Sequence, residues 1–307
     1  MSILVFGHKN PDTDTICSAI AYAELKGKLG KDVKAVRLGE VNEETKFVLD
    51  YFKVEKPELI ESVSGKEIML VDHNERTQTA DGFEEAKVLE LVDHHRISNF
   101  NVDEPLYVRM EPVGCTATII LKLFKENNLL PAPTTAGLML SAIVSDTLLF
   151  KSPTCTECDV KAGKELAEIA GVNVEEYGLE MLKAGTALGG KSEAELINMD
   201  MKIFEVDGSK IGVAQVNTVN EAELLERKEK LLVEINNIIK KEGLKFFIFA
   251  ITNILSNDST GIVAGDGNAI IEKAFNEKID NNLIALKGVV SRKKQIIPPL
   301  TKAIQEA

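Results

Sequence analysis

Short apolar runs alternate with helical patterns along the first part of the chain. The apolar runs have the length of buried strands and lie at residues 3–6, 33–38, 68–71 and 88–92. Helical periodicity covers about 15–29 and 43–52. Strands that alternate with helices predict an α/β fold with a mainly parallel sheet covered on both faces. In such sheets, ligands bind beyond the carboxyl ends of the strands.

The pattern changes after a glycine-rich stretch at 188–193. Before it, residues 114–185 have helical patterns, including an amphipathic segment at 134–147. After it come strand patterns at 202–206, 211–219, 245–254 and 260–264, and one long helix with apolar positions from Leu224 to Ile239. The glycines and the change of pattern predict a domain boundary. We expect an N-terminal domain at 1–188, a hinge linker at 189–193 and a smaller C-terminal α/β domain with a mixed sheet at 194–307.

All four histidines lie in three short acidic motifs, each directly after a predicted strand. The motifs span residues 7–14, 71–75 and 91–95. Imidazole and carboxylate groups therefore recur together where strands run into loops. A mixed set of nitrogen and oxygen ligands suits a borderline or hard first-row divalent cation. The pattern predicts a metal site at the carboxyl edge of the first sheet.

In the first motif, the turn from strand to helix can bring His8, Asp12 and Asp14 together. Either aspartate alone could instead cap the helix that follows. A cap needs one side chain, so three such residues in one turn favour a metal site.

The other two motifs carry Asp72 and the sequence Asp93-His94-His95. A carboxylate at the position of Asp72 could bridge two cations, or it could simply form a turn. Adjacent residues on an extended chain point apart, so His94 and His95 should have different roles. We expect one to be a ligand and the other a substrate contact or proton donor.

A further acidic residue, Asp146, interrupts an apolar helical segment. A carboxylate there is costly to bury unless it is paired or bound to a metal. The alternative is an exposed position on the polar side of the helix.

The charge balance is strongly acidic. The chain has 48 Asp and Glu against 36 Lys and Arg, a net charge of −12, so we expect no nucleic-acid partner, which would need a broad basic face. No apolar run approaches the roughly 20 residues of a membrane span, and the N-terminus lacks the features of a secretory signal. The four cysteines fit reduced intracellular thiols, and Cys155 and Cys158 lack the second pair of a zinc site. We therefore expect a cytoplasmic protein without a membrane partner.

The C-terminal domain offers cations instead of metal ligands. Residues 291–295 form a basic cluster in which Arg292 and Lys293 could hold phosphate oxygens, since arginine presents a planar fork and lysine a mobile charge. The alternative is a solvated basic surface. Lys202, taken alone, is an ordinary strand lysine.

Together these segments resemble the DHH phosphoesterases, and more narrowly the manganese-dependent family II inorganic pyrophosphatases with a DHHA2-type C-terminal domain. The resemblance extends over nearly the whole chain. It rests on residues 8–14, 72–74, 93–95, 145–147, 152–156 and 291–295.

The resemblance implies a two-metal hydrolase with two Mn²⁺ (or Co²⁺) per subunit and Mg²⁺ that arrives with the substrate. It implies two ligand sets that share Asp72: one of His8, Asp12 and Asp72, the other of Asp14, Asp72, His94 and Asp146. Asp93 would support the site from outside. The substrate-binding residues would be His95, Lys202, Arg292 and Lys293.

The expected reaction is the hydrolysis of pyrophosphate to two phosphates by a hydroxide that bridges the two metals, with both domains contributing to the site. The resemblance also implies a homodimer. Exopolyphosphatase or another DHH phosphodiesterase is the alternative activity, although His8 favours pyrophosphate. A non-catalytic regulator would be expected to lack some of the six ligands, and all six are present.

Overall fold

The computed structural model describes residues 2–186, 188 and 190–306. The chain divides into two compact units, Met1–Gly185 and Thr186–Ala307, each described here by itself. The predicted hinge at 189–193 includes Gly189, which lies outside the described residues, so the hinge stays a prediction.

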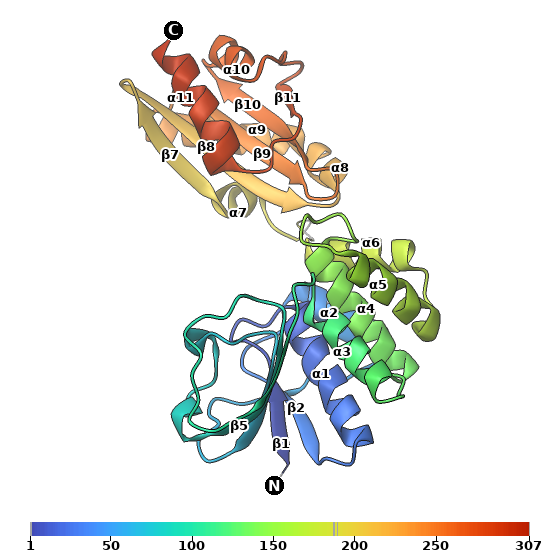
Figure 1. The fold of residues 1–307 in the computed structure, drawn as a ribbon. Helices are drawn as coiled ribbons and strands as arrows, with labels where there is room; N and C mark the ends of the chain where they lie inside the picture. Colours follow the sequence, from blue (N-terminus) through green and yellow to red (C-terminus); the bar gives the residue numbers. More distant parts are fainter. Residues whose placement is uncertain (1, 187, 189, 307) are drawn as a thin grey trace. The chain divides into compact units, whose positions relative to one another are not determined.

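The first unit is built on a six-stranded sheet in the order β3-β2-β1-β4-β5-β6, with all neighbours parallel (Figure 1). The strands are β1 (Ile3–Phe6), β2 (Val33–Arg37), β3 (Glu58–Leu59), β4 (Glu67–Val71), β5 (Lys87–Asp93) and β6 (Tyr107–Met110). This confirms the predicted parallel α/β sheet. Strand β3, which has two residues, and the edge strand β6 were not predicted.

One face of this sheet is covered by helices. They are α1 (Thr13–Lys28), α2 (Glu43–Tyr51), α3 (Thr116–Glu126), α4 (Pro133–Thr147), α5 (Glu157–Ala170) and α6 (Val174–Gly185). Helices α1 and α3 pack on the strands, α4 packs on α1, and α5 and α6 pack on α4. The opposite face is covered by irregular segments with two short 3₁₀ helices, η1 (Arg76–Gln78) and η2 (Phe83–Glu85). There, alternate strand residues such as Phe6, Ile68 and Leu70 pack against Phe83.

The second unit contains a mixed five-stranded sheet in the order β11-β10-β9-β8-β7, in which only β8 and β9 are parallel. Its strands are β7 (Met201–Val206), β8 (Ser209–Thr218), β9 (Phe246–Asn253), β10 (Asp258–Gly265) and β11 (Leu283–Leu286). Its helices are α7 (Glu193–Asn198), α8 (Glu221–Leu225), α9 (Lys228–Glu242), α10 (Asn268–Phe275) and α11 (Ile297–Gln305), with a π-helical turn η3 (Arg292–Ile296) before α11.

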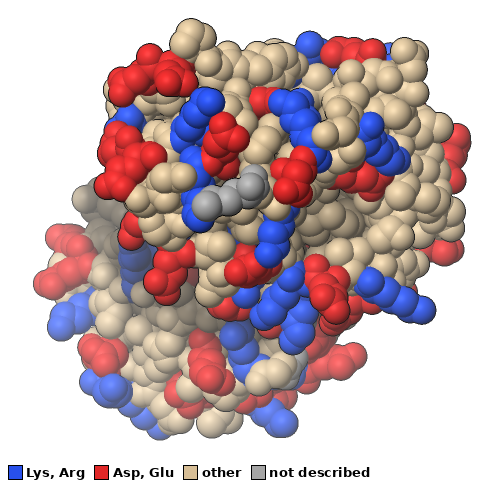
Figure 2. All heavy atoms as spheres, turned by 90° about the horizontal axis from the view of Figure 1, so that it is seen from below, with Lys and Arg blue, Asp and Glu red and all other residues tan. Residues whose placement is uncertain are grey.

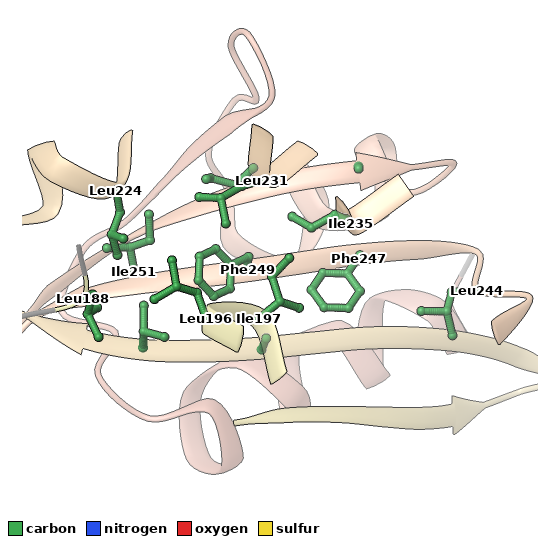
Figure 3. Packing of buried hydrophobic residues seen from close by; sticks show 14 residues of the cluster. Leu188, Leu196, Ile197, Leu224, Leu231, Ile235, Leu244, Phe247, Phe249 and Ile251 are labelled. Atoms are coloured by element: carbon green, nitrogen blue, oxygen red, sulfur yellow. The ribbon is translucent and has the colours of Figure 1, made fainter. Parts of the chain in front are cut away.

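Strand β9 is buried on both faces because its side chains alternate between two cores. Phe247 and Phe249 pack with Leu231 of α9 in one core (Figure 3). Phe246 and Ile248 pack with Leu300 of α11 in the other. Burial on both faces explains why this strand is a continuous apolar run in the sequence.

The prediction of one long helix from Leu224 to Ile239 is wrong. The chain forms α8 and α9 instead, because Arg227 leaves the helical region with φ −93° and ψ 7°. The Arg227 guanidinium there donates to Glu193 at 2.9 Å and to the Lys191 carbonyl at 2.7 Å. The apolar spacing that suggested one helix is kept across the break, since both helices face the same core.

The charged residues of the surface are mixed. On the face in Figure 2, Lys and Arg side chains are interspersed with Asp and Glu instead of gathering in one broad patch. Within the described residues, no helix is long and apolar enough to span a membrane.

A buried acidic residue on β5 provides a test of the fold. Glu90 pairs with Lys26 at 2.6 Å and with Lys31 at 3.3 Å, and it accepts a hydrogen bond from the Tyr22 hydroxyl. Burial alone would raise the pKa of Glu90, but the contacts with Lys26 and Tyr22 outweigh it and lower this pKa. A lowered folded-state pKa stabilises the protein above the unfolded value of about 4.3, and this contribution is lost as the pH falls through the folded-state pKa.

We therefore expect Glu90→Gln to lower the free energy of unfolding at pH 7 by about 1–2 kcal/mol, with a smaller difference below pH 4. Urea unfolding at both pH values measures this. The control Glu58→Gln, which removes an exposed carboxylate paired with Lys34, should change little at either pH. An effect of Glu90→Gln that did not depend on pH would contradict the assigned ion pair.

Candidate metal centre

The three histidine motifs meet at one edge of the first sheet. His8 follows β1, Asp72 follows β4 and Asp93 ends β5, and these three strands are neighbours in the sheet. Parallel strands end at the same edge, so the sheet order brings together residues that are far apart in the sequence.

His8 and Asp12 face Asp72 across this edge. His8 Nε2 lies 3.4 Å from Asp12 Oδ2 and 3.5 Å from Asp72 Oδ2. Asp12 is also the N-cap of α1, since its Oδ1 accepts from the Thr15 backbone N–H at 2.9 Å. The two roles considered for Asp12 therefore coexist: one oxygen caps the helix and the other faces His8.

Asp72 occupies the centre of the site. Its side chain is 1% exposed, and its φ of 57° places it in the left-handed region, which Asp tolerates better than most residues. One oxygen accepts from the Thr15 hydroxyl at 2.6 Å, and the other from the Thr116 hydroxyl at 3.1 Å. His94 Nε2 lies 3.5 Å from Asp72 Oδ1. Asp72 thus belongs to two groups of ligand type, one with His8 and one with His94.

The tandem histidines differ in exposure and in hydrogen bonding, but the prediction that their side chains point apart is wrong. Their ring centroids are 4.2 Å apart, and His94 Nε2 and His95 Nδ1 lie 3.5 Å and 3.7 Å from the same oxygen, Asp72 Oδ1. His94 Nδ1 donates to the Val113 carbonyl at 3.0 Å, which leaves Nε2 to face Asp72 and Asp146, the latter at 3.9 Å. His95 is half-exposed, and its Nδ1 lies 3.0 Å from Asp93 Oδ1. Because a carboxylate accepts, this contact places the proton on Nδ1 and leaves His95 Nε2 free.

The last two predicted ligands, Asp14 and Asp146, lie close to one another and to the buried thiol of Cys115. Asp14 is held by the backbone N–H groups of Thr116 at 2.7 Å and Ala117 at 3.3 Å. Asp146 is 18% exposed and lies in the last turn of α4, so the alternative of an exposed surface position does not hold. A helix C-terminus favours positive charge, so a carboxylate there calls for a cation nearby.

The electrostatics show a surplus of negative charge. Burial, reinforced by the charge of Asp14, raises the pKa of Asp72 to about 7. Burial and the same neighbour raise the pKa of Asp146 well above its usual range. Burial alone would lower the pKa of His94, but its hydrogen bond with Asp72 and the charge of Asp14 raise it to about 9. Each shift reflects carboxylates that repel one another and favour any positive charge.

These residues fit divalent cations. The two groups offer imidazole nitrogens and carboxylate oxygens, with Asp72 common to both, and the donor types suit Mn²⁺ and similar ions. Among the described residues, the six predicted ligands fall into three such groups: His8, Asp12 and Asp72; Asp72 and His94, together with His95; and Asp14 and Asp146, together with Cys115.

Three of the four predicted substrate-binding residues, Lys202, Arg292 and Lys293, lie in the second unit. Arg292 is the first residue of η3, and its guanidinium pairs with Asp200 Oδ1 at 2.8 Å. This pair holds Arg292 beside the start of β7, which carries the exposed Lys202. Lys293 follows on η3 and is exposed. Single π-helical turns are frequent at functional sites.

Several residues around the site were not assigned roles from the sequence. Asn74 donates to Asp93 at 2.6 Å and accepts from the Ser98 backbone N–H at 2.7 Å, so it fastens the second motif to the third. Glu44 of α2 accepts from Thr13 at 2.7 Å and from Ser145 at 2.5 Å, each next to a predicted ligand. Glu44 lies in an ordinary amphipathic helix, so nothing in its own sequence surroundings indicated the contact.

His73 is buried, and its Nδ1 lies 3.0 Å from the Val71 carbonyl. Burial lowers its pKa to about 4, so this imidazole is neutral. It lines the same pocket as His8, Asp72 and His95, but it is not a member of the groups of described residues that could hold a metal ion.

The fold and the site define an α/β protein with a candidate metal centre at the carboxyl edge of a parallel sheet. The model of the DHH family, N-terminal domain, matches residues 2–143, and that of the DHHA2 domain matches residues 179–303.

An Exiguobacterium protein named "Probable manganese-dependent inorganic pyrophosphatase" is 60% identical over 98% of both chains. A Bacillus cereus protein of the same name is 56% identical over 99% of both. The crystal structure of a Methanococcus jannaschii protein assigned to the family II inorganic pyrophosphatases is 44% identical, with a TM-score of 0.63, over 99% of this chain and 100% of that one. The chain belongs to the manganese-dependent family II inorganic pyrophosphatases.

Proposed function

We propose that this protein hydrolyses inorganic pyrophosphate to two phosphates at a centre of two Mn²⁺ ions. The observation that carries the proposal is the position of Asp72, buried between His8 and His94 with 3.5 Å to each ring nitrogen. The names of the similar proteins give the substrate and the metal.

The proposed ligands of one cation are His8, Asp12 and Asp72, and those of the other are Asp14, Asp72, His94 and Asp146. Two such cations (Mn²⁺, or Co²⁺ in its place, with Mg²⁺ brought by the substrate) would polarise phosphate oxygens and lower the pKa of water, so that hydroxide would be available at neutral pH.

The remaining chemistry is assigned to side chains of the protein. Asp93 fixes the ring of His95 through Nδ1, and we propose that the free Nε2 donates a hydrogen bond to a phosphate oxygen once His95 is protonated. Burial would lower the pKa of His95, but the contact with Asp93, the larger influence, raises it and favours this protonated form.

In the second unit, Arg292, Lys293 and Lys202 supply the positive charge that a departing phosphate requires. We propose that they bind the substrate held at the cations. The Asp200 pair and the bond from the Arg292 backbone N–H to Gln215 Oε1 at 2.9 Å keep the Arg292 fork in one orientation. Both terminal nitrogens of the guanidinium contact Asp200, Nη1 at its backbone carbonyl and Nη2 at its Oδ1. We propose that the remaining N–H groups of this pre-oriented guanidinium bind phosphate oxygens.

Two further expectations are part of this proposal. The cysteines Cys17, Cys115, Cys155 and Cys158 are free thiols, which supports a cytoplasmic location. A homodimer is expected from the family resemblance.

The test is phosphate release from pyrophosphate, tripolyphosphate and dinucleotides, after chelation and again after addition of Mn²⁺ or Mg²⁺. We expect activity on pyrophosphate that is lost on chelation and restored by Mn²⁺. A preference for tripolyphosphate would favour the alternative activity of an exopolyphosphatase, and cleavage of dinucleotides would favour a DHH phosphodiesterase. Full activity without a metal would contradict the two-cation centre.

A further inference from the structure

One short segment, Val113–Thr118, contacts three of the six proposed ligands. The Val113 carbonyl accepts a hydrogen bond from His94 Nδ1, and the Thr116 backbone N–H donates to Asp14. The Thr116 hydroxyl donates to Asp72. The orientation of these ligands therefore depends on where this segment lies.

The segment is held by a carboxylate that is not a proposed ligand. Asp159 of α5 is fully buried, and its Oδ2 accepts from the Gly114 backbone N–H at 2.8 Å. Its Oδ1 accepts from the Thr118 hydroxyl at 2.6 Å. Asp159 thus accepts hydrogen bonds from the segment on both sides of Thr116, at Gly114 and at Thr118.

Close packing makes this contact specific. A Cβ added to Gly114 would meet Asp159 Oδ2 at 2.8 Å and Thr147 Cγ2 at 3.0 Å. Thr147 directly follows the proposed ligand Asp146. Glycine at 114 therefore lets the carboxylate and the end of α4 approach the same point of the backbone.

The Ser-Pro-Thr-Cys-Thr motif at 152–156 gains a role from this arrangement. Thr156 is the N-cap of α5, and its backbone N–H and hydroxyl each donate to Asp159 Oδ2 at 2.7 Å. The capping box fixes the Asp159 side chain, because its rotamer is set by the start of its own helix. The motif supplies none of the proposed ligands, but its Thr156 orients the buried Asp159 carboxylate toward Val113–Thr118.

We propose that Asp159 is a positioning residue of the metal centre, which acts through Val113–Thr118 on Asp14, Asp72 and His94. The proposal rests on the proposed cation site. Outer partners of metal ligands commonly change metal affinity by about 10- to 100-fold when they are removed. Asp159→Ala removes the acceptor of four hydrogen bonds and frees the segment to shift.

The experiment is a Mn²⁺ titration followed by electron paramagnetic resonance of the free ion, on the full chain without substrate. We expect Asp159→Ala to lower Mn²⁺ affinity at least about 10-fold. Asp159→Asn should restore most of it, since its oxygen can replace Oδ2 and its amide can donate to the Thr118 hydroxyl. Tyr22→Phe is the control, because it removes a buried hydrogen bond to Glu90 elsewhere in the same unit.

Thermal melts of all variants separate positioning from loss of fold. If Asp159→Ala is folded and binds Mn²⁺ like wild type, or if Tyr22→Phe loses Mn²⁺ in proportion to its lost stability, the proposal is overturned. Should Asp159→Ala not fold, Gly114→Ala answers the question instead, since its Cβ displaces the carboxylate without deleting a polar group. Wild-type affinity in Gly114→Ala would overturn the proposal. Failure of wild type to bind Mn²⁺ would reject the cation site itself.

Discussion

Replacing Asp72 with Asn should greatly weaken the binding of both proposed cations. The substitution keeps the size of the side chain but removes the charge that both ligand groups share. In wild type, the Thr15 and Thr116 hydroxyls each donate to a different oxygen of Asp72. Asparagine has only one side-chain oxygen, so one of the two hydroxyls loses its acceptor. We expect Mn²⁺ affinity to fall by at least about 100-fold, the upper end of what loss of an outer partner produces.

Turnover of pyrophosphate should fall with it, by at least about 10³-fold, since bound cations supply several kcal/mol of transition-state stabilisation. Calorimetry measures the number of bound ions and their affinity, and phosphate release measures turnover. The matched control is Asp32→Asn, an exposed carboxylate that accepts a hydrogen bond from Ser2. Two tightly bound Mn²⁺ ions in Asp72→Asn would show that Asp72 is not shared.

Replacing Arg292 with Ala should separate substrate binding from metal binding. Arg292 belongs to the second unit, where it contacts Asp200 and Gln215, and neither of these is a proposed ligand. We expect unchanged Mn²⁺ affinity and a fall in kcat/KM for pyrophosphate of about 10²–10³-fold, the usual effect of losing one donor to developing negative charge.

Steady-state kinetics at saturating Mn²⁺ measures this effect. Lys294→Ala is the control, since Lys294 is an exposed neighbour on η3 with no proposed role. Arg292→Lys should recover only part of the activity, because lysine keeps the charge but not the planar fork. If Arg292→Ala lost Mn²⁺ instead, Arg292 would be acting on the metal centre and not on phosphate.

Strand and helix patterns predicted most elements of the fold where the hydrophobic signal was strong. The runs at 3–6 and 68–71 became β1 and β4, and the segment at 134–147 became α4. Predictions failed where local pattern was weak or ambiguous. The edge strand β6 has exposed residues on both faces, and the break between α8 and α9 depends on the contacts of Arg227 with Glu193 and the Lys191 carbonyl. Contacts between distant residues leave no trace in local periodicity.

The sequence by itself determined which candidate ligand residues follow the strands, because alternation of apolar and polar residues is a local property. The expectation that His94 and His95 point apart failed, because both follow the end of β5 and their rings lie 4.2 Å apart beside Asp72. The order of β1, β4 and β5 was decided only by the tertiary structure, and that order puts Asp72 between the two histidines. The supporting contacts of Asn74, Glu44 and Asp159 were decided there as well. Each spans a long stretch of chain, and such pairings exist only when packing closes the loops between them.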